Sequence, residues 1–167
     1  SRRLHSGTLA SVRFWKGVGI FSLLLFSSGS LRAEILTVSL ADSKTKLASF
    51  QMFVGDRWCI LWNHSVQGFE VEDCYENRAG VMTLVRSHLP DFAAGLDHIP
   101  GRGRQTSDGQ GGYWIEDLDE PVPGNAYILR PGGPLVNHRL RTDHNEISLT
   151  ALAERARVRI SLNSESN

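Results

Sequence analysis

Residues 58–75 read WCILWNHSVQGFEVEDCY, and this stretch predicts two strands joined by a turn. Trp58 to Trp62 is almost wholly apolar, whereas Phe69 to Glu72 alternates apolar and acidic residues, as a half-buried strand does. Polar residues and a glycine gather between His64 and Gly68, where a turn is expected. The stretch therefore predicts a β-hairpin with a polar tip.

Cys59 and Cys74 lie on the two sides of this hairpin and are the two cysteines of the chain. A turn centred on Val66 and Gln67 would place them directly opposite each other, whereas a turn at Gln67 and Gly68 would offset them by two residues. In an oxidising compartment such a pair is a candidate disulfide, worth about 3 kcal/mol through loop-closure entropy. Two buried free thiols are the alternative.

Short strands are also expected on both sides of the hairpin, at 35–40, 50–54, 80–85, 113–115, 126–129, 138–140 and 157–162. Turns rich in Gly, Asn and Pro separate them, and only 149–156 has a helical pattern, which is too short for more than one or two turns. Regularly spaced short strands of this kind are typical of all-β proteins. We predict an antiparallel β-sandwich or partly open barrel of about eight to ten short strands.

The first 33 residues have the composition of a secretory signal peptide. They contain basic but no acidic residues, a short apolar run at 18–26, and small residues before Ala33, where cleavage is expected. The apolar run is shorter than the ~20 residues that a membrane-spanning helix needs. Leu31 is large for its place near the cleavage site, so an uncleaved anchor is the alternative. We predict a periplasmic protein with a signal peptide at 1–33 and a single β domain at 34–167.

The net charge of the predicted β domain differs from that of the whole chain. The chain has 18 basic and 18 acidic residues, but five of the basic ones lie in 1–33, which leaves 13 basic against 18 acidic residues and a charge of −5. An acidic domain repels phosphate backbones, so nucleic-acid binding is not expected. Membrane contact is expected only through an uncleaved leader.

One segment, 87–112, interrupts the regular spacing of strands. It is rich in glycine and proline and shows little periodicity, so it is predicted as one long loop. Loops of this length in a compact domain are usually functional or disordered. Gly101 to Arg104 has the composition of a phosphate-binding turn, but it follows no clear strand and opens no helix, so no phosphate site is predicted there.

His64 and Ser65 suggest hydrolytic chemistry, but their spacing does not favour it. A nucleophilic serine needs a base within hydrogen-bond reach, and neighbouring residues of a strand point to opposite faces. No Gly-x-Ser-x-Gly, His-Glu-x-x-His or Cys-x-x-Cys pattern is present. Glu70 and Glu72 would share one face, where a solvated polar surface is the simplest interpretation. We therefore predict no catalytic residue, no metal ligand and no cofactor.

Several short motifs occur in an order that spans most of residues 47–162: His64–Gln67, Asp73, Tyr75, Phe92–Leu96, Gly112–Trp114 and His138–Leu140. In this order they resemble a family of small exported bacterial proteins, domain of unknown function 1850. Genes of that family commonly lie beside TAXI-type TRAP transporters. The chain departs from the family pattern at Asp73, where Glu is usual, and at Asp97, where Pro is usual. The two cysteines are not part of the pattern.

The resemblance implies a biological context, because the family has no established activity. We expect a periplasmic accessory or binding protein of a TRAP-type (TAXI) solute uptake system, without catalysis. The expected polar cluster of His64, Ser65, Asp73, Gly95 and His138 would contact a small solute or the transporter subunits. The alternative hypothesis is a hydrolase or metal-dependent enzyme that uses His64, Ser65 and nearby carboxylates.

Overall fold

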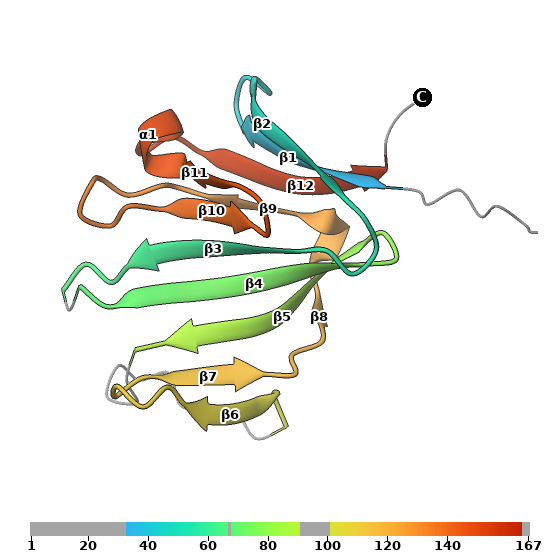
Figure 1. Ribbon diagram of the computed structural model, residues 1–167. Coiled ribbons are helices and arrows are strands. Elements are labelled where there is room, and N and C mark those ends of the chain that lie inside the picture. Colours follow the sequence, from blue (N-terminus) through green and yellow to red (C-terminus); the bar gives the residue numbers. More distant parts are fainter. Residues whose placement is uncertain (1–32, 67, 91–100, 165–167) are drawn as a thin grey trace, which may run out of the picture. The chain divides into compact units, whose positions relative to one another are not determined.

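The computed structural model describes residues 33–66, 68–90 and 101–164 (Figure 1). The predicted signal peptide therefore lies outside the described residues, apart from Ala33. None of the helices in the described part of the chain has the length and hydrophobicity needed to span a bilayer.

The described residues form two antiparallel sheets. The smaller sheet has four strands, in the spatial order β2 (Lys46–Met52), β1 (Glu34–Leu40), β12 (Val158–Ser164) and β9 (Ala126–Leu129). The larger sheet has eight strands. Its path is β11 (Glu146–Ser148), β10 (Arg139–Thr142), β3 (Arg57–Asn63), β4 (Glu70–Arg78), β5 (Val81–Leu89), β7 (Tyr113–Glu116) and β6 (Arg104–Ser107), and β8 (Glu120–Pro121) pairs with β5.

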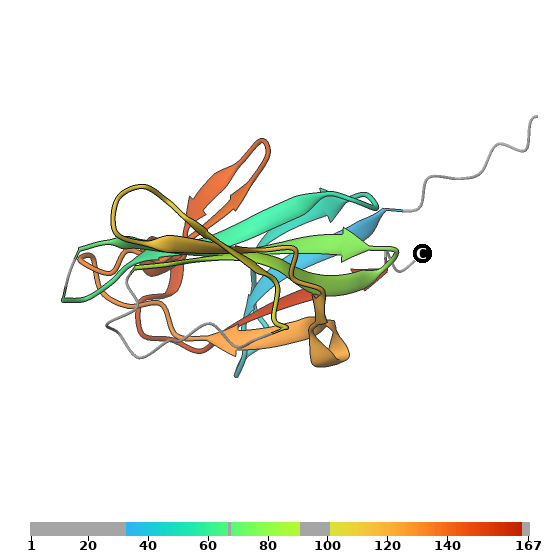
Figure 2. The same cartoon turned by 90° about the horizontal axis from the view of Figure 1, so that it is seen from below.

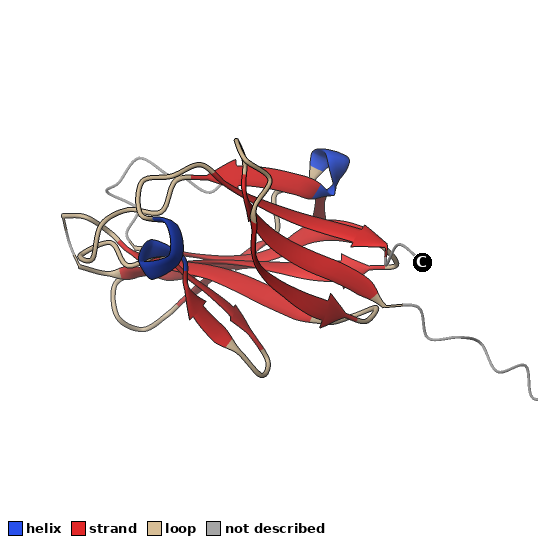
Figure 3. Ribbon diagram, turned by 90° about the horizontal axis from the view of Figure 1, so that it is seen from above, coloured by secondary structure: helices blue, strands red, loops and turns tan. Residues whose placement is uncertain are grey.

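The two sheets lie as two layers (Figure 2), so the predicted all-β sandwich is confirmed and the sheets do not close into a barrel. Twelve strands are present among the described residues, where about eight to ten were expected. The helix α1 (Leu149–Ala153) and the 3-10 turn η2 (Pro123–Asn125) are short and lie at opposite ends of the sandwich (Figure 3). The Ser148 side chain caps α1 by accepting a hydrogen bond from the Ala151 backbone N–H.

The main hydrophobic core fills the space between the layers. Alternate residues of β3 point inward, so that Trp58 and Ile60 are buried and Trp62 packs against the same cluster. The four-stranded sheet contributes its own inward residues: Leu36, Val38, Met52, Val158, Ile160 and Leu162. A second cluster of Tyr113, Ile115 and Leu118 lies at the β7 side of the larger sheet.

The hairpin of β3 and β4 has the first of the two predicted registers, in which the two cysteines lie directly opposite each other. Cys59 pairs directly with Cys74, and the two sulfurs form a disulfide, which confirms the candidate bond. A bulge follows in the next ladder, because Cys74 pairs with Arg86 while Tyr75 pairs with Leu84, so that Val85 is the extra residue.

The segment predicted as one loop, 87–112, contains strand residues at both ends. Strand β5 continues to Leu89 and strand β6 occupies Arg104–Ser107, so the connection between them is shorter than expected. The sequence of β6, RQTS, has no apolar alternation because this strand is at the edge of the sheet and pairs only with β7. Residues 91–100, with Gly95, lie outside the described residues.

Candidate functional site

The tip of the β3–β4 hairpin holds His64 and Ser65. The His64 backbone N–H donates to the Phe69 carbonyl at 2.7 Å, and the His64 carbonyl accepts from the Gly68 N–H at 2.9 Å. The His64 Nδ1 accepts from the Val66 N–H at 3.4 Å, while Ser65 is exposed. The imidazole is thus held by its own turn, which is the arrangement of a structural hairpin end.

Asp73 lies on the inner side of β4, in line with Ile60 of β3 and Ser87 of β5. The Ser87 hydroxyl donates to the Asp73 carboxylate at 2.6 Å. Burial raises the pKa of the Asp73 carboxyl, although the Ser87 hydrogen bond and the positive charge of Arg102 act against this rise. The acidic residue that the family resemblance singled out is therefore an interior carboxylate.

Aromatic rings surround this carboxylate on one side. Trp58 stacks on Tyr75 with 5.8 Å between ring centroids, and Tyr75 stacks on Tyr127 at 5.0 Å. Burial raises the pKa of both phenols, and the charge of Asp73 raises the pKa of Tyr75 further. Both tyrosines thus stay neutral at physiological pH, and Asp73 is the group of this interior cluster that can change its charge.

His138 precedes β10 and has a packing role in the structure. Its ring stacks on Trp62 with 5.7 Å between centroids, and its Nδ1 accepts from the Gly132 backbone N–H at 3.0 Å. Its own backbone N–H donates to the Thr150 hydroxyl at 2.9 Å. Burial lowers the pKa of the imidazole, so the ring is neutral, as the accepting Nδ1 requires.

The hydrogen bonds and ring contacts of the described residues join no two of His64, Ser65, Asp73 and His138. Asp73 lies opposite Ile60, four residues before His64 on β3, which is roughly 13 Å along a strand. His138 is nearer to the hairpin end, beside Trp62. Because Gly95 lies outside the described residues, the polar cluster of five residues stays a prediction.

A different histidine, His88 of β5, is held at the outer side of the larger sheet. Its Nε2 lies 2.8 Å from Oδ2 of Asp108, and its Nδ1 lies 3.1 Å from the carbonyl of Glu70. Asp108 also accepts backbone N–H bonds from Gln110 and Gly112, at 2.7 and 2.9 Å. Both ring nitrogens lie within hydrogen-bond distance of a protein oxygen, so these contacts fix the position of the ring. This His–Asp pair holds a loop in place.

The His88 ring belongs to a column of stacked groups on this outer surface. It lies 4.9 Å from the Phe69 ring and 4.2 Å from the Trp114 ring, and the Arg86 guanidinium covers the other side of Trp114 at 3.4 Å. Arg86 also pairs with Glu116 at 2.9 Å. The sequence predicts a strand at 113–115 but contains no local pattern for this column, because its members come from separate strands and a turn.

One group of three potential metal ligands occurs among the described residues, namely Cys59, Glu72 and Cys74. The two sulfurs of this group are bonded to each other, and a Glu72 carboxylate oxygen lies 3.1 Å from the Cys74 sulfur. In the oxidised protein the group therefore offers one carboxylate instead of two thiolates, which is a poor ligand set for a soft metal.

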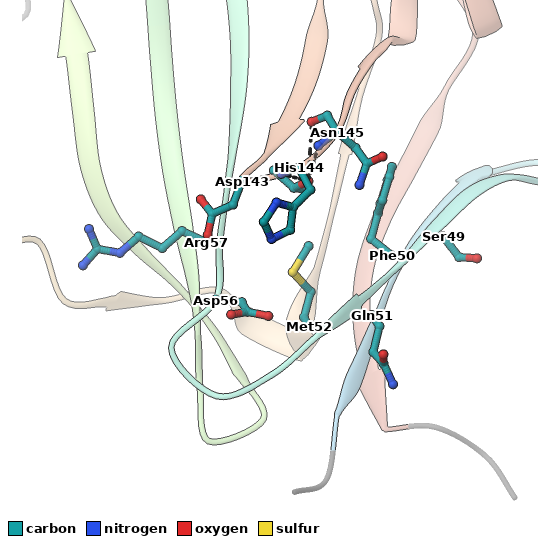
Figure 4. Close-up of a pocket in the computed structure, with 10 residues that line it drawn as sticks. Ser49, Phe50, Gln51, Met52, Asp56, Arg57, Asp143, His144 and Asn145 are labelled. Carbon is teal, nitrogen blue, oxygen red and sulfur yellow. Dashed lines mark hydrogen bonds between the residues drawn. The ribbon is translucent and has the colours of Figure 1, made fainter.

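A pocket of about 410 Å³ opens at the edge of the sandwich, between β2 and the turn that joins β10 to β11 (Figure 4). In this view the His144 ring is turned toward Met52. Phe50 and Met52 form an apolar wall, whereas Asp56 and Asp143 place carboxylates around the space. We call this space the edge pocket.

The positive charge of Arg57, which also lines the edge pocket, is balanced by Glu76 at 2.7 Å. Asp56 accepts one hydrogen bond, from the Phe53 backbone N–H at 2.8 Å. Asp143 is exposed and has no ion-pair partner among the described residues. The local charge of the edge pocket is thus negative, which favours a ligand with a cationic group.

The described residues thus form a β-sandwich with one disulfide, an interior carboxylate and a small edge pocket. The chain belongs to the family Domain of unknown function (DUF1850), whose pattern matches residues 59–149. This result confirms the family that the motifs of the sequence resemble. No curated protein and no solved structure matches the chain.

The matched range coincides closely with the larger sheet. Strands β4 to β11 lie wholly inside it, and β3 begins two residues before it. Strands β1, β2 and β12, which make up most of the smaller sheet, lie outside it. The match therefore covers one layer of the sandwich and β9 of the other.

Proposed function

We propose that this protein is a binding domain that acts outside the cytoplasm as an accessory of a TRAP-type (TAXI) solute uptake system. The edge pocket is the observation that carries the binding role, because it combines an apolar wall with unbalanced carboxylates. Its volume, about 410 Å³, lies in the range of small-molecule sites. In this proposal the protein holds a small solute, or a short segment of a transporter subunit, and does not transform it.

Two further observations support the proposed compartment and system. The Cys59–Cys74 disulfide is the kind of bond that persists in oxidising compartments such as the periplasm. The gene neighbourhood that the family resemblance implies supports the link with the transporter. Both observations agree with the signal peptide that the sequence predicts at residues 1–33.

The chemistry of the edge pocket indicates the class of ligand. Asp56 and Asp143 would pair with an ammonium or amidinium group, while Phe50 and Met52 would cover a short apolar part. His144 adds a donor or an acceptor, depending on its protonation. The proposed ligand is therefore a small solute with one cationic group, or a Lys or Arg side chain of a partner.

Deletion of the gene tests the proposal through TRAP-dependent uptake of labelled solutes in whole cells. We expect a loss of uptake for at least one solute, restored by the wild-type gene and not by the Asp143→Asn, His144→Gln variant. Asp119→Asn, which removes an exposed carboxylate far along the sequence from the pocket, should restore uptake as the wild type does. Unchanged uptake of every solute in the deletion strain would contradict the proposal.

A further inference from the structure

The arginines of the larger sheet and its loops are all neutralised. Each has a carboxylate oxygen within 4.0 Å, and the set comprises Arg57, Arg78, Arg86, Arg102, Arg104, Arg139 and Arg141. This pattern is expected for a domain in which acidic residues outnumber basic ones. A basic side chain without a carboxylate partner is therefore a candidate for binding an anion.

The remaining six basic residues after Ala33 belong to the smaller sheet and its adjoining turns: Lys44, Lys46, Arg130, Arg155, Arg157 and Arg159. Two carboxylates accompany them, since Asp42 lies 2.8 Å from Arg157 and Glu154 lies 3.6 Å from Arg155. Lys44, Lys46, Arg130 and Arg159 have no ion-pair partner among the described residues. Positive charge is thus concentrated where these six residues lie, and we call this part of the smaller sheet and its turns the arginine corner.

The strand register brings these charges together. β12 pairs with β9 so that Val158 lies opposite Leu129, and the next step along both strands places Arg157 beside Arg130. Arg159 lies on β12, two residues after Arg157, which directly precedes the strand, so an extended backbone places the two side chains on the same face about 6.6 Å apart. On the other side of β12, Ser39 of β1 lies between Arg159 and Lys46 of β2. Four basic side chains therefore share one end of the outer surface of this sheet.

A hollow of about 390 Å³ lies at this corner. Three arginines line it, Arg130, Arg155 and Arg157, together with one acidic residue, Asp42. Leu40 and Ala156 add apolar surface, and Ser43 adds a hydroxyl. The backbone also fixes the lining, because the Arg155 carbonyl accepts from the Arg130 guanidinium at 3.3 Å and the Arg155 N–H donates to the Pro131 carbonyl at 2.8 Å.

Asp42 pairs with Arg157 and Glu154 pairs with Arg155, whereas Arg130 beside them has no carboxylate partner among the described residues. An anion in the hollow would supply a negative partner for Arg130. Guanidinium groups bind carboxylate and phosphate oxygens through paired N–H donors, which gives both strength and orientation. The surrounding positive charge would also attract an anion to the hollow.

We propose that the arginine corner is a binding site for a small multivalent oxyanion, a solute that carries phosphate or several carboxylate groups. The hollow has the volume of a small-molecule site and a net positive lining. Arg155 and Arg157 lie outside residues 59–149, so the match with the family does not cover the whole site. It is separate from the edge pocket and does not depend on the proposed function of that pocket.

Titration of the purified protein with two probes, inorganic phosphate and citrate, tests this site by NMR at constant ionic strength. We expect saturable amide shifts at residues 40–43, 130 and 155–157. The probe that binds more tightly shows whether the site prefers phosphate or carboxylate groups. Chloride at the same ionic strength should produce no saturable shift. The Arg130→Gln, Arg155→Gln variant should bind the tighter probe at least tenfold more weakly.

The matched control is Arg78→Gln, Arg104→Gln, because these two arginines are also exposed, at 40% and 61%, and line neither pocket. This control should bind both probes as the wild type does. Absence of a saturable shift with either probe would overturn the proposal, as would equal weakening in the two double variants. Binding to vesicles of phosphatidylglycerol without binding of phosphate or citrate would also overturn it and would assign the corner to a membrane surface.

Discussion

Cys59 and Cys74 face each other across β3 and β4 with their Cα atoms 4.1 Å apart, and their sulfurs are bonded. This short spacing is that of a non-hydrogen-bonded antiparallel pair, in which side chains are closest. The bond fixes the register of the hairpin that supplies Trp58 and Tyr75 to the core.

Replacement of both cysteines by alanine should lower the free energy of unfolding by about 3 kcal/mol, because the bond closes a loop across a sequence separation of 15. Urea unfolding of the wild type and the double variant measures the loss. Denatured wild-type protein should show no free thiol before reduction and two after it. Two thiols without reductant would contradict the disulfide.

Asp73→Asn should change how stability depends on pH. The folded protein binds a proton at Asp73 more tightly than the unfolded chain does, because burial raises the pKa of this carboxyl. Above the pKa that Asp73 has in the folded protein, the carboxylate is charged and lowers the stability of the fold. Stability therefore rises as the pH falls from that pKa toward the ordinary pKa of 3.8. The neutral asparagine removes this dependence.

The difference in the free energy of unfolding between Asp73→Asn and the wild type should thus favour the variant more at pH 7 than at pH 4. Urea unfolding at both pH values measures this difference. Asp119→Asn, at a carboxylate that is 76% exposed, is the control and should show no such difference. An Asp73→Asn effect of equal size at the two pH values would show that burial does not raise the pKa of Asp73.

Asn77→Ala should cost about 2 to 6 kcal/mol of stability. The side chain is fully buried, its Nδ2 donates to the Met52 carbonyl at 3.0 Å, and its Oδ1 accepts from the Gly80 N–H at 2.8 Å. Alanine leaves both backbone groups unsatisfied, at about 1–3 kcal/mol each. Thermal and urea unfolding measure the effect, and a loss below about 1 kcal/mol would contradict it.

Asp108→Ala should loosen the loop between β6 and β7. The Asp108 carboxylate accepts from the Gln110 and Gly112 N–H groups, and these bonds, together with His88, lower its pKa. Amide hydrogen exchange at residues 110 and 112 should therefore be faster in the variant. Asp117→Ala, at a carboxylate that is 71% exposed and paired with Arg104, should leave exchange at both amides unchanged.

Lowering the pH should reproduce this effect in the wild type. Because the folded pKa of Asp108 is depressed, its contribution is present above the ordinary value of 3.8 and is lost as the pH falls through the folded pKa. Protection at Gly112 that does not change over this window would show that the carboxylate does not hold the loop.

Much of the fold can be predicted from the sequence, because inward and outward residues alternate in β1, β12 and the first half of β4, and because β3 is a short apolar run. Strands β6, β8 and β11 are missed, since RQTS, EP and EIS are too short or too polar to show a period. The turn residues alone left two registers for the hairpin. The observed register is the one that brings the two sulfurs together.

The candidate site was less predictable because its groups meet across strands. Alternation places Asp73 on the same face as Val71 and Tyr75, yet nothing in the local pattern shows that this face is interior. His88 and Asp108 are 20 residues apart, and the arginine corner joins residues from several strands and turns. Such contacts depend on the order and register of strands, which local composition does not contain.

The division of the sandwich between matched and unmatched strands has a practical consequence for anyone who expresses this protein. A fragment cut at the limits of the family pattern, 59–149, would lack β1, β2 and β12 and would leave the inner surface of Tyr75 and Ile60 open to water. Such a fragment should aggregate or pair with other copies through that apolar surface. Expression that begins at Ala33 and retains the last strand keeps both layers together.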